Sequence, residues 1–140
     1  MAKGDDIQSR LVKFAVRVLD LCEKLPKTFG GRHIAGQLIR SATSAAPNYA
    51  EARGAESKND FVHKLGITFK ELNESEVWLE MLSERRLVPE PELRPIQQEC
   101  KILCRIIAAS RKTAGGLPKR ETEQKSESPE DPGLCHNDCP

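Results

Sequence analysis

The chain has 140 residues, with 22 basic and 21 acidic side chains and a net charge of +1 at pH 7. That length fits one domain of ordinary size. No stretch approaches the roughly 20 apolar residues of a membrane-spanning helix, and the opening MAKGDDIQSR lacks the apolar run of a signal peptide. We therefore expect a cytoplasmic protein with no membrane partner. Its five cysteines, an odd number, predict reduced thiols rather than a disulfide framework.

The first predicted helix carries a heptad-type apolar seam and ends before Pro26. Its seam residues follow one another at steps of four and three: Ile7, Leu11, Phe14, Val18, Leu21 and Leu25. The segment FGGRH that comes next lacks the spacing of a phosphate-binding loop. It is typical of a turn between two helices.

The second predicted helix covers residues 31–53 and contains Pro47. One of its faces holds Ile34, Leu38, Ala42, Ala45 and Tyr49. Because proline lacks the amide that would bond to the Thr43 carbonyl, we expect the helix to bend there. The side chains of Thr43, Ser44 and Asn48 are expected to satisfy the group that is freed.

The third predicted helix begins after Ser57, which can cap it, while Asp60 can return a hydrogen bond. Its seam is Phe61, Leu65, Phe69, Leu72, Leu79 and Leu82, and it is expected to end near Leu87. The fourth helix, after VPEPE, has the seam Leu93, Ile96, Cys100, Leu103 and Ile107. Four amphipathic helices with short connections predict an all-α, antiparallel up-down-up-down four-helix bundle over residues 5–113.

Residues 1–4 are expected to be flexible and residues 114–140 to form a disordered polar tail, because the tail holds almost no large apolar side chain. The tail contains three basic and six acidic residues, which leaves a mild basic excess on the predicted bundle. Its CHNDC segment, residues 135–139, has no second pair of ligands to close a tetrahedral metal site. No metal and no cofactor are predicted.

A second apolar stripe lies away from the seam on three of the helices, at 100° per residue. On any one helix such residues could be ordinary surface aliphatics, but three stripes favour self-association. The predicted oligomer interface comprises Val12, Val16, Leu19, Ile67, Trp78, Met81, Ile102 and Ile106.

Basic residues form a band beside the seam of the first helix and another on the fourth. The predicted nucleic-acid-binding residues are Arg10, Lys13, Arg17, Lys24, Arg94, Lys101, Arg105 and Lys112. In an up-down bundle these helices are neighbours, so the bands could merge into one face suited to phosphates. The alternative is a solvated face whose long stems cover the edge of the core. No aromatic residue interleaves the bands as a stacking surface requires.

Candidate catalytic groups are few. His33, His63 and His136 are far apart and lack the carboxylate spacing of a helical metal site. Cys100 and Cys104 lie in the middle of a seam, where cysteine acts as a small hydrophobe. We therefore expect no enzyme and no small-molecule substrate.

Residues 37–82 contain the positions of a dense sequence signature: Arg40, Ser41, Ser44, Asn48, Tyr49, Glu51, Ala52, Ala55, Glu56, Ser57, Asp60, Phe61, His63, Lys64, Lys70, Glu71, Glu76, Trp78 and Leu79. This signature resembles that of the four-helix-bundle proteins encoded inside intervening sequences of bacterial ribosomal RNA genes. The resemblance implies a homopentameric ring. Distant relatives are the accessory variability determinants of diversity-generating retroelements, in which a basic pentamer binds a reverse transcriptase and nucleic acid.

Part of this run is expected to form a polar cluster where the second helix meets the third, with an architectural role. Its members are Arg40, Asn48, Tyr49, Glu51, Glu56, Asp60, His63 and Lys64. The predicted function is a non-enzymatic oligomeric module that binds RNA, DNA or a nucleic-acid enzyme such as a reverse transcriptase through the basic face. The alternative is a structural or protein-interaction ring with no nucleic-acid role.

Overall fold

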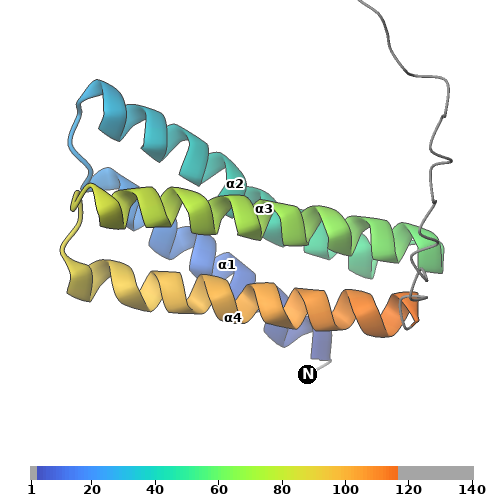
Figure 1. The fold of residues 1–140 in the computed structure, drawn as a ribbon. Helices are drawn as coiled ribbons and strands as arrows, with labels where there is room; N and C mark the ends of the chain where they lie inside the picture. Colours follow the sequence, from blue (N-terminus) through green and yellow to red (C-terminus); the bar gives the residue numbers. More distant parts are fainter. Residues whose placement is uncertain (1–2, 117–140) are drawn as a thin grey trace, which may run out of the picture.

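A computed structural model describes residues 3–116, and this part of the chain forms four helices and no strand (Figure 1). The helices are α1 Lys3–Glu23, α2 Phe29–Arg53, α3 Lys58–Glu84 and α4 Glu90–Gly115. Successive helices run in opposite directions and are joined by short turns. The all-α prediction is confirmed. The outer helices reach slightly beyond residues 5–113, and the CHNDC segment of the predicted tail lies outside the described residues.

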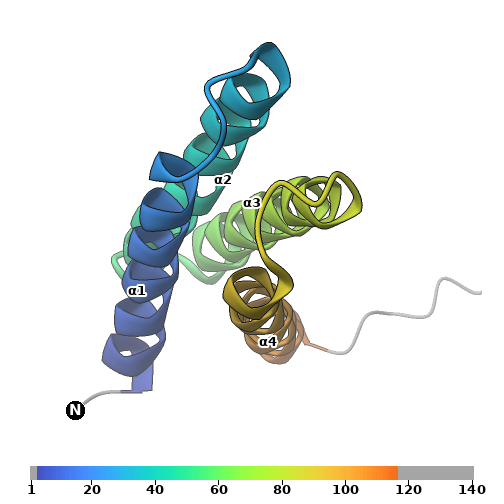
Figure 2. The ribbon, with the colours of Figure 1, turned by 90° about the vertical axis from the view of Figure 1, so that its left-hand side faces the viewer.

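The molecule consists of two helical hairpins, α1–α2 and α3–α4, which lie on opposite sides of the core (Figure 2). Helix α2 packs against α3 over much of its length, whereas α1 and α4 contact each other least among the neighbouring pairs. The turns at residues 24–28 and 85–89 lie at one end of the molecule, which we name the turn end. Within residues 3–116, no helix is both long and apolar enough to cross a membrane.

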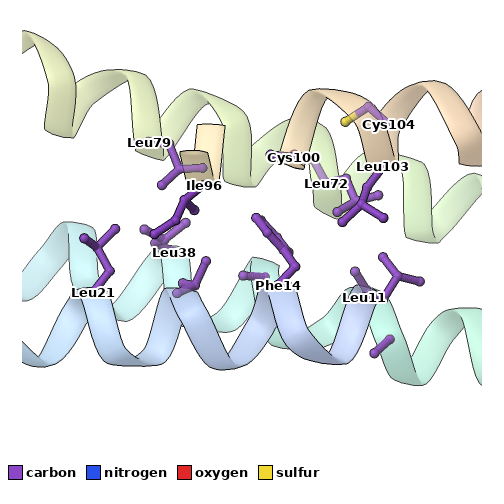
Figure 3. Close-up of a cluster of buried hydrophobic side chains, with 14 of the residues drawn as sticks. Leu11, Phe14, Leu21, Leu38, Leu72, Leu79, Ile96, Cys100, Leu103 and Cys104 are labelled. Atoms are coloured by element: carbon purple, nitrogen blue, oxygen red, sulfur yellow. The ribbon is translucent and has the colours of Figure 1, made fainter. Parts of the chain in front are cut away.

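The predicted seams meet in a single core (Figure 3). All of their residues are buried except four half-buried ones that pack against the core: Ile7, Ile34, Phe61 and Phe69. Removing a leucine side chain of this kind from water contributes about 1.5–3 kcal/mol. Burial of the seams therefore explains why these four amphipathic segments associate.

One polar contact lies inside this core, between α2 and α3. The hydroxyl oxygens of Ser41 and Ser75 are 2.8 Å apart, and both side chains are fully buried. Each hydroxyl is also within hydrogen-bonding distance of a carbonyl of its own helix, Leu38 and Glu71 respectively. The pair is therefore satisfied, and its small side chains let the two helices approach closely.

The segment FGGRH belongs to α2 and is not the turn that its composition suggests. The Thr28 hydroxyl accepts a hydrogen bond from the Gly31 amide at 3.1 Å and so begins the helix at Phe29. A β-carbon at Gly31 would lie 2.0 Å from the Pro26 carbonyl oxygen. Glycine is therefore required for the close approach of α2 to the preceding turn.

Helix α2 continues through Pro47, but the side chains expected to bond to the Thr43 carbonyl do not do so. The Thr43 and Ser44 hydroxyls donate to the carbonyls of Ile39 and Arg40, and the Asn48 amide donates to Ser44. Each side chain reaches the carbonyl four residues before it, so only residue 47 is placed to reach Thr43. Pro47 itself is exposed, which leaves this side of the helix open to solvent.

The end of α3 forms a Schellman turn, with hydrogen bonds from the Leu87 amide to the Leu82 carbonyl and from the Arg86 amide to the Ser83 carbonyl. The residue in the left-handed conformation is Arg86, with φ of 52°. Glycine usually occupies this position because a β-carbon there costs roughly 1–2 kcal/mol. The chain therefore holds an arginine where its backbone favours glycine.

We predict that Arg86→Gly raises the free energy of unfolding by about 1 kcal/mol, because the substitution removes the steric penalty of the left-handed conformation. Urea unfolding followed by circular dichroism measures this change. The matched control is Arg85→Gly at the neighbouring position, which has ordinary helical angles and should lose up to about 1 kcal/mol. A destabilised Arg86→Gly variant would contradict the prediction.

Candidate functional site

The basic band of α1 is partly occupied by contacts with α4. The Arg10 guanidinium donates two hydrogen bonds of 3.0 Å to the Glu99 carboxylate, which raises the pKa of Arg10. Lys24 lies 3.6 Å from Glu92. These two cations therefore join the first helix to the last, and they are less available to an external anion than predicted.

The basic band of α4 faces away from α1, so the two bands do not form one surface. Glu92 and Glu99 mark the side of α4 that contacts α1. Lys101 follows Glu99 by two residues, which places it about 200° around the helix, and Arg105 and Lys112 lie on the same side as Lys101. The predicted merger is therefore wrong, because neighbouring helices can turn their charged faces in different directions.

Three cations of the α4 band have no acidic partner among the ion pairs of residues 3–116: Lys101, Arg105 and Lys112. All three are exposed. Arg94, the fourth predicted member, forms an ion pair with Glu90 one turn before it. On α1, Lys13 and Arg17 are also exposed, but they face a different side of the molecule. We name Lys101, Arg105 and Lys112 the α4 cations.

The second apolar stripe is clearest on α1. Val12, Val16 and Leu19 are 47%, 49% and 38% exposed, and we name them the α1 stripe. On the other helices Met81 and Ile102 are exposed, whereas Ile67 and Ile106 are half-buried. The sequence pattern missed Val77, which is exposed beside Met81, and Phe29, which projects from the first turn of α2.

Trp78, a predicted member of the exposed stripe, instead packs against the core of the single chain. Its indole N–H lies 3.3 Å from a Glu74 carboxylate oxygen, and its ring meets the His33 ring edge-on at 5.8 Å. The contact with His33 links α3 to α2. Trp78 therefore stabilises the monomer, and it is a poor choice for testing an interface.

The predicted polar cluster is divided among several places. Arg40 pairs with Glu74 and lies 3.7 Å from Glu71, while Lys64 pairs with Glu51 at 2.7 Å. The remaining members take separate roles: Asn48 bonds within α2, Tyr49 is buried, the Asp60 amide donates to the Ser57 hydroxyl, and Glu56 and His63 are exposed. The expectation of one cluster is wrong, but each of these ion pairs joins α2 to α3 and so serves the architecture.

The two carboxylates beside Arg40 experience opposite environments. The hydrogen bond from Arg40 lowers the pKa of Glu74. Burial raises the pKa of Glu71, whose Oε2 atom is buried without a hydrogen-bond partner, and the attraction of Arg40 does not overcome this effect. Arg40 therefore stabilises one carboxylate and only partly compensates the other.

Cys100 and Cys104 are core residues, as predicted, and so is Cys22. The Cys100 thiol is fully buried and donates to the Leu72 carbonyl at 3.3 Å, and the Cys104 thiol lies 3.6 Å from the Asn73 side-chain oxygen. Burial raises the pKa of Cys22 to about 11, and the neighbouring Cys104 together with burial raises the pKa of Cys100. Within residues 3–116, no three histidine, cysteine or acidic side chains gather as metal ligands.

Residues 5–109 match the model of the 23S rRNA-intervening sequence protein family. The chain belongs to this family. It is similar to the crystal structure of a protein of unknown function from the S23 ribosomal protein family of Bacteroides thetaiotaomicron VPI-5482, with 30% identity and a TM-score of 0.73 over 79% of this chain and 99% of that one. No curated protein matches. The family resemblance is thus confirmed, while the retroelement link stays a prediction.

We predict that Glu74→Gln and Glu71→Gln differ in stability at neutral pH. The Glu74 pair stabilises the fold above the ordinary carboxyl pKa, and this stabilisation is lost as pH falls through the lowered pKa of the folded state. Removing its charge should cost up to about 1 kcal/mol at pH 7, since solvent screens the half-exposed pair, and nothing in acid. The ionised Glu71 is disfavoured above its raised pKa, so Glu71→Gln should be neutral or stabilising. Urea unfolding of both variants at neutral pH and in acid tests this prediction. An equal loss of unfolding free energy for the two variants at neutral pH would contradict it.

Proposed function

We propose that this family member is a non-catalytic helical module that assembles with copies of itself through its exposed apolar surfaces. The α1 stripe carries this proposal, because it places three aliphatic side chains on consecutive turns facing away from the core. A contiguous apolar surface of this kind is typical of a contact site. The lack of a metal-ligand cluster in residues 3–116 supports a module without catalysis.

The form of assembly that we propose is a closed ring. A ring requires two different surfaces on each subunit, because each copy contacts one neighbour with one face and the other neighbour with another. The α1 stripe and the Val77–Met81 patch on α3 are two such surfaces on separate helices. The resemblance described above implies five members.

The first test is the mass of the protein in solution, measured by light scattering at micromolar concentration. A chain of 15.6 kDa should form a complex several times heavier, and Val16→Glu should dissociate it while helical content is kept. An unpaired charge is costly in an apolar contact but harmless on a monomer surface. Val77→Glu, at an equally exposed valine, shows whether α3 supplies the second face. A monomeric wild-type protein would contradict assembly.

A second proposed function is the binding of nucleic acid, alone or together with an enzyme such as a reverse transcriptase, by the α4 cations. The supporting observation is that Lys101, Arg105 and Lys112 lie exposed on one side of α4 with no acidic partner among the described ion pairs. Three cations bind phosphates weakly. In a ring, however, each copy displays the same three, so several weak contacts add.

The salt dependence of duplex DNA binding tests this second function. Replacing all three α4 cations with glutamine should weaken binding and lower the slope of log affinity against log salt by roughly 0.9 for each phosphate that is no longer neutralised. The control replaces Lys58 and Lys70, two exposed lysines of α3, and should leave the slope almost unchanged. If the wild-type protein retains no duplex even at low salt, the α4 cations are only a solvated face.

A further inference from the structure

Phe29 is the most unusual side chain on the surface. It is 99% exposed, whereas every other aromatic residue between 3 and 116 is buried or half-buried. Its position is determined by the Thr28 cap and the close approach of Gly31 to Pro26, which hold the first turn of α2 in place. A phenyl ring in this position is stabilised when a partner covers it and removes it from water.

A hollow lies beside this ring at the turn end. It is lined by Phe29, Gly30, Gly31 and Ile34 together with Thr28 from the α2 side, and by Arg85 and Leu87 from the other turn. Two segments more than 50 residues apart in sequence therefore build it. Its walls are mainly apolar and no acidic residue lines it, so it suits a flat, uncharged ring system.

Four exposed cations lie in or next to the two turns of the turn end: Lys27, Arg32, Arg85 and Arg86. Arg85 lines this hollow, whereas Lys27 and Arg32 line a second hollow and Arg86 a third. None of them takes part in the ion pairs of residues 3–116. The unpaired acids nearest in sequence are Glu23 and Glu84, while Glu90 and Glu92 are engaged by Arg94 and Lys24. The turn end therefore carries an excess of positive charge.

Arg86 provides a separate observation. It occupies the left-handed position of the Schellman turn, where glycine would relieve the backbone. An arginine there costs stability and places a guanidinium at the turn end beside Arg85. Strained positions of this kind are concentrated at functional sites.

We propose that the turn end binds single-stranded nucleic acid, with a base stacked on the Phe29 ring over the hollow and the phosphates against Arg85 and Arg86. Aromatic rings that accept bases, combined with cations that follow the backbone, are the general means of binding single strands. Duplexes are poorer ligands because their base faces are already stacked. A lipid surface would use the ring and the charges but leave the hollow without a role. The site is separate from the α4 cations and does not depend on self-association.

The test measures the fluorescence anisotropy of a labelled oligouridine of about 15 nucleotides with the full chain at low salt. Phe29→Ala should weaken binding about tenfold, since stacking on an aromatic ring contributes that much per base. Phe29→Trp should keep wild-type affinity, because the larger ring stacks equally well. The control Asn59→Ala, at an exposed side chain in the first turn of α3 and outside every proposed surface, should have no effect.

Arg86→Gly separates a binding role from a structural one. If Arg86 contacts phosphate, the variant should bind the oligonucleotide several-fold more weakly and lower the salt slope by about 0.7, although it melts at a higher temperature. If Arg86 makes no contact with phosphate, the affinity and the salt slope stay at their wild-type values although the variant is more stable, and this result would contradict the role proposed for Arg86. Phe29→Ala should weaken oligouridine binding just as much when the three α4 cations have already been replaced with glutamine. The test therefore remains valid even if the α4 cations do not bind duplex DNA.

Three results would overturn the proposal. Phe29→Ala could bind oligouridine as tightly as the wild type, so that the ring takes no part in binding. The same variant could lower the mass of the assembly, so that Phe29 contacts a second copy of the chain. Finally, Phe29-dependent binding could be found with vesicles of anionic phospholipid but not with oligouridine. Circular dichroism shows whether Phe29→Ala is folded, and Arg86→Gly provides the test if it is not.

Discussion

Close packing of α2 against its neighbours is the constraint on which the arrangement of the other helices depends. The buried side of α2 is made largely of small side chains: Gly31, Ser41, Ala42, Ala45, Ala46 and Ala52. Small residues bring helix backbones together, and the remaining space is filled by leucines of α3 and by Phe14 and Leu11 of α1. Because α2 contacts both helices extensively, it determines where they lie. Helix α4 then contacts α1 only weakly, with the Arg10–Glu99 pair at their junction.

This arrangement of the helices determines which charged side chains can contact an external partner. Cations that face a neighbouring helix form ion pairs within the chain, as Arg10, Arg40 and Lys64 do. The α4 cations and four cations of the turn end, Lys27, Arg32, Arg85 and Arg86, take no part in the ion pairs of residues 3–116. The chain is nearly neutral overall, so the anion binding that we propose depends on this division rather than on net charge. Some carboxylates join helices, as Glu51, Glu74 and Glu99 do, and the basic side chains supply most of the charge on the proposed binding surfaces.

Much of the fold follows from the sequence because burial repeats with the helical period. The leucine seams and the Ser57 cap depend on residues close together in the chain, so both can be predicted. The rotation of one helix about its axis relative to its neighbour depends on tertiary packing. The separation of the two basic bands therefore cannot be predicted from the sequence. Trp78 and Phe29 show the same limit: both are aromatic residues near helix surfaces, yet one packs against His33 and the other projects into solvent. No local pattern distinguishes them.

The positions of Lys3 and Gly116 have a practical consequence for the orientation of the molecule. Both ends of the described chain lie at the same end of the bundle as the α2–α3 turn, away from the turn end (Figure 1). A molecule anchored to a bead, a sensor chip or a fusion partner through either position therefore presents Phe29 and its surrounding cations outward. Immobilisation leaves this surface accessible, whereas a tether placed in residues 24–28 would cover it.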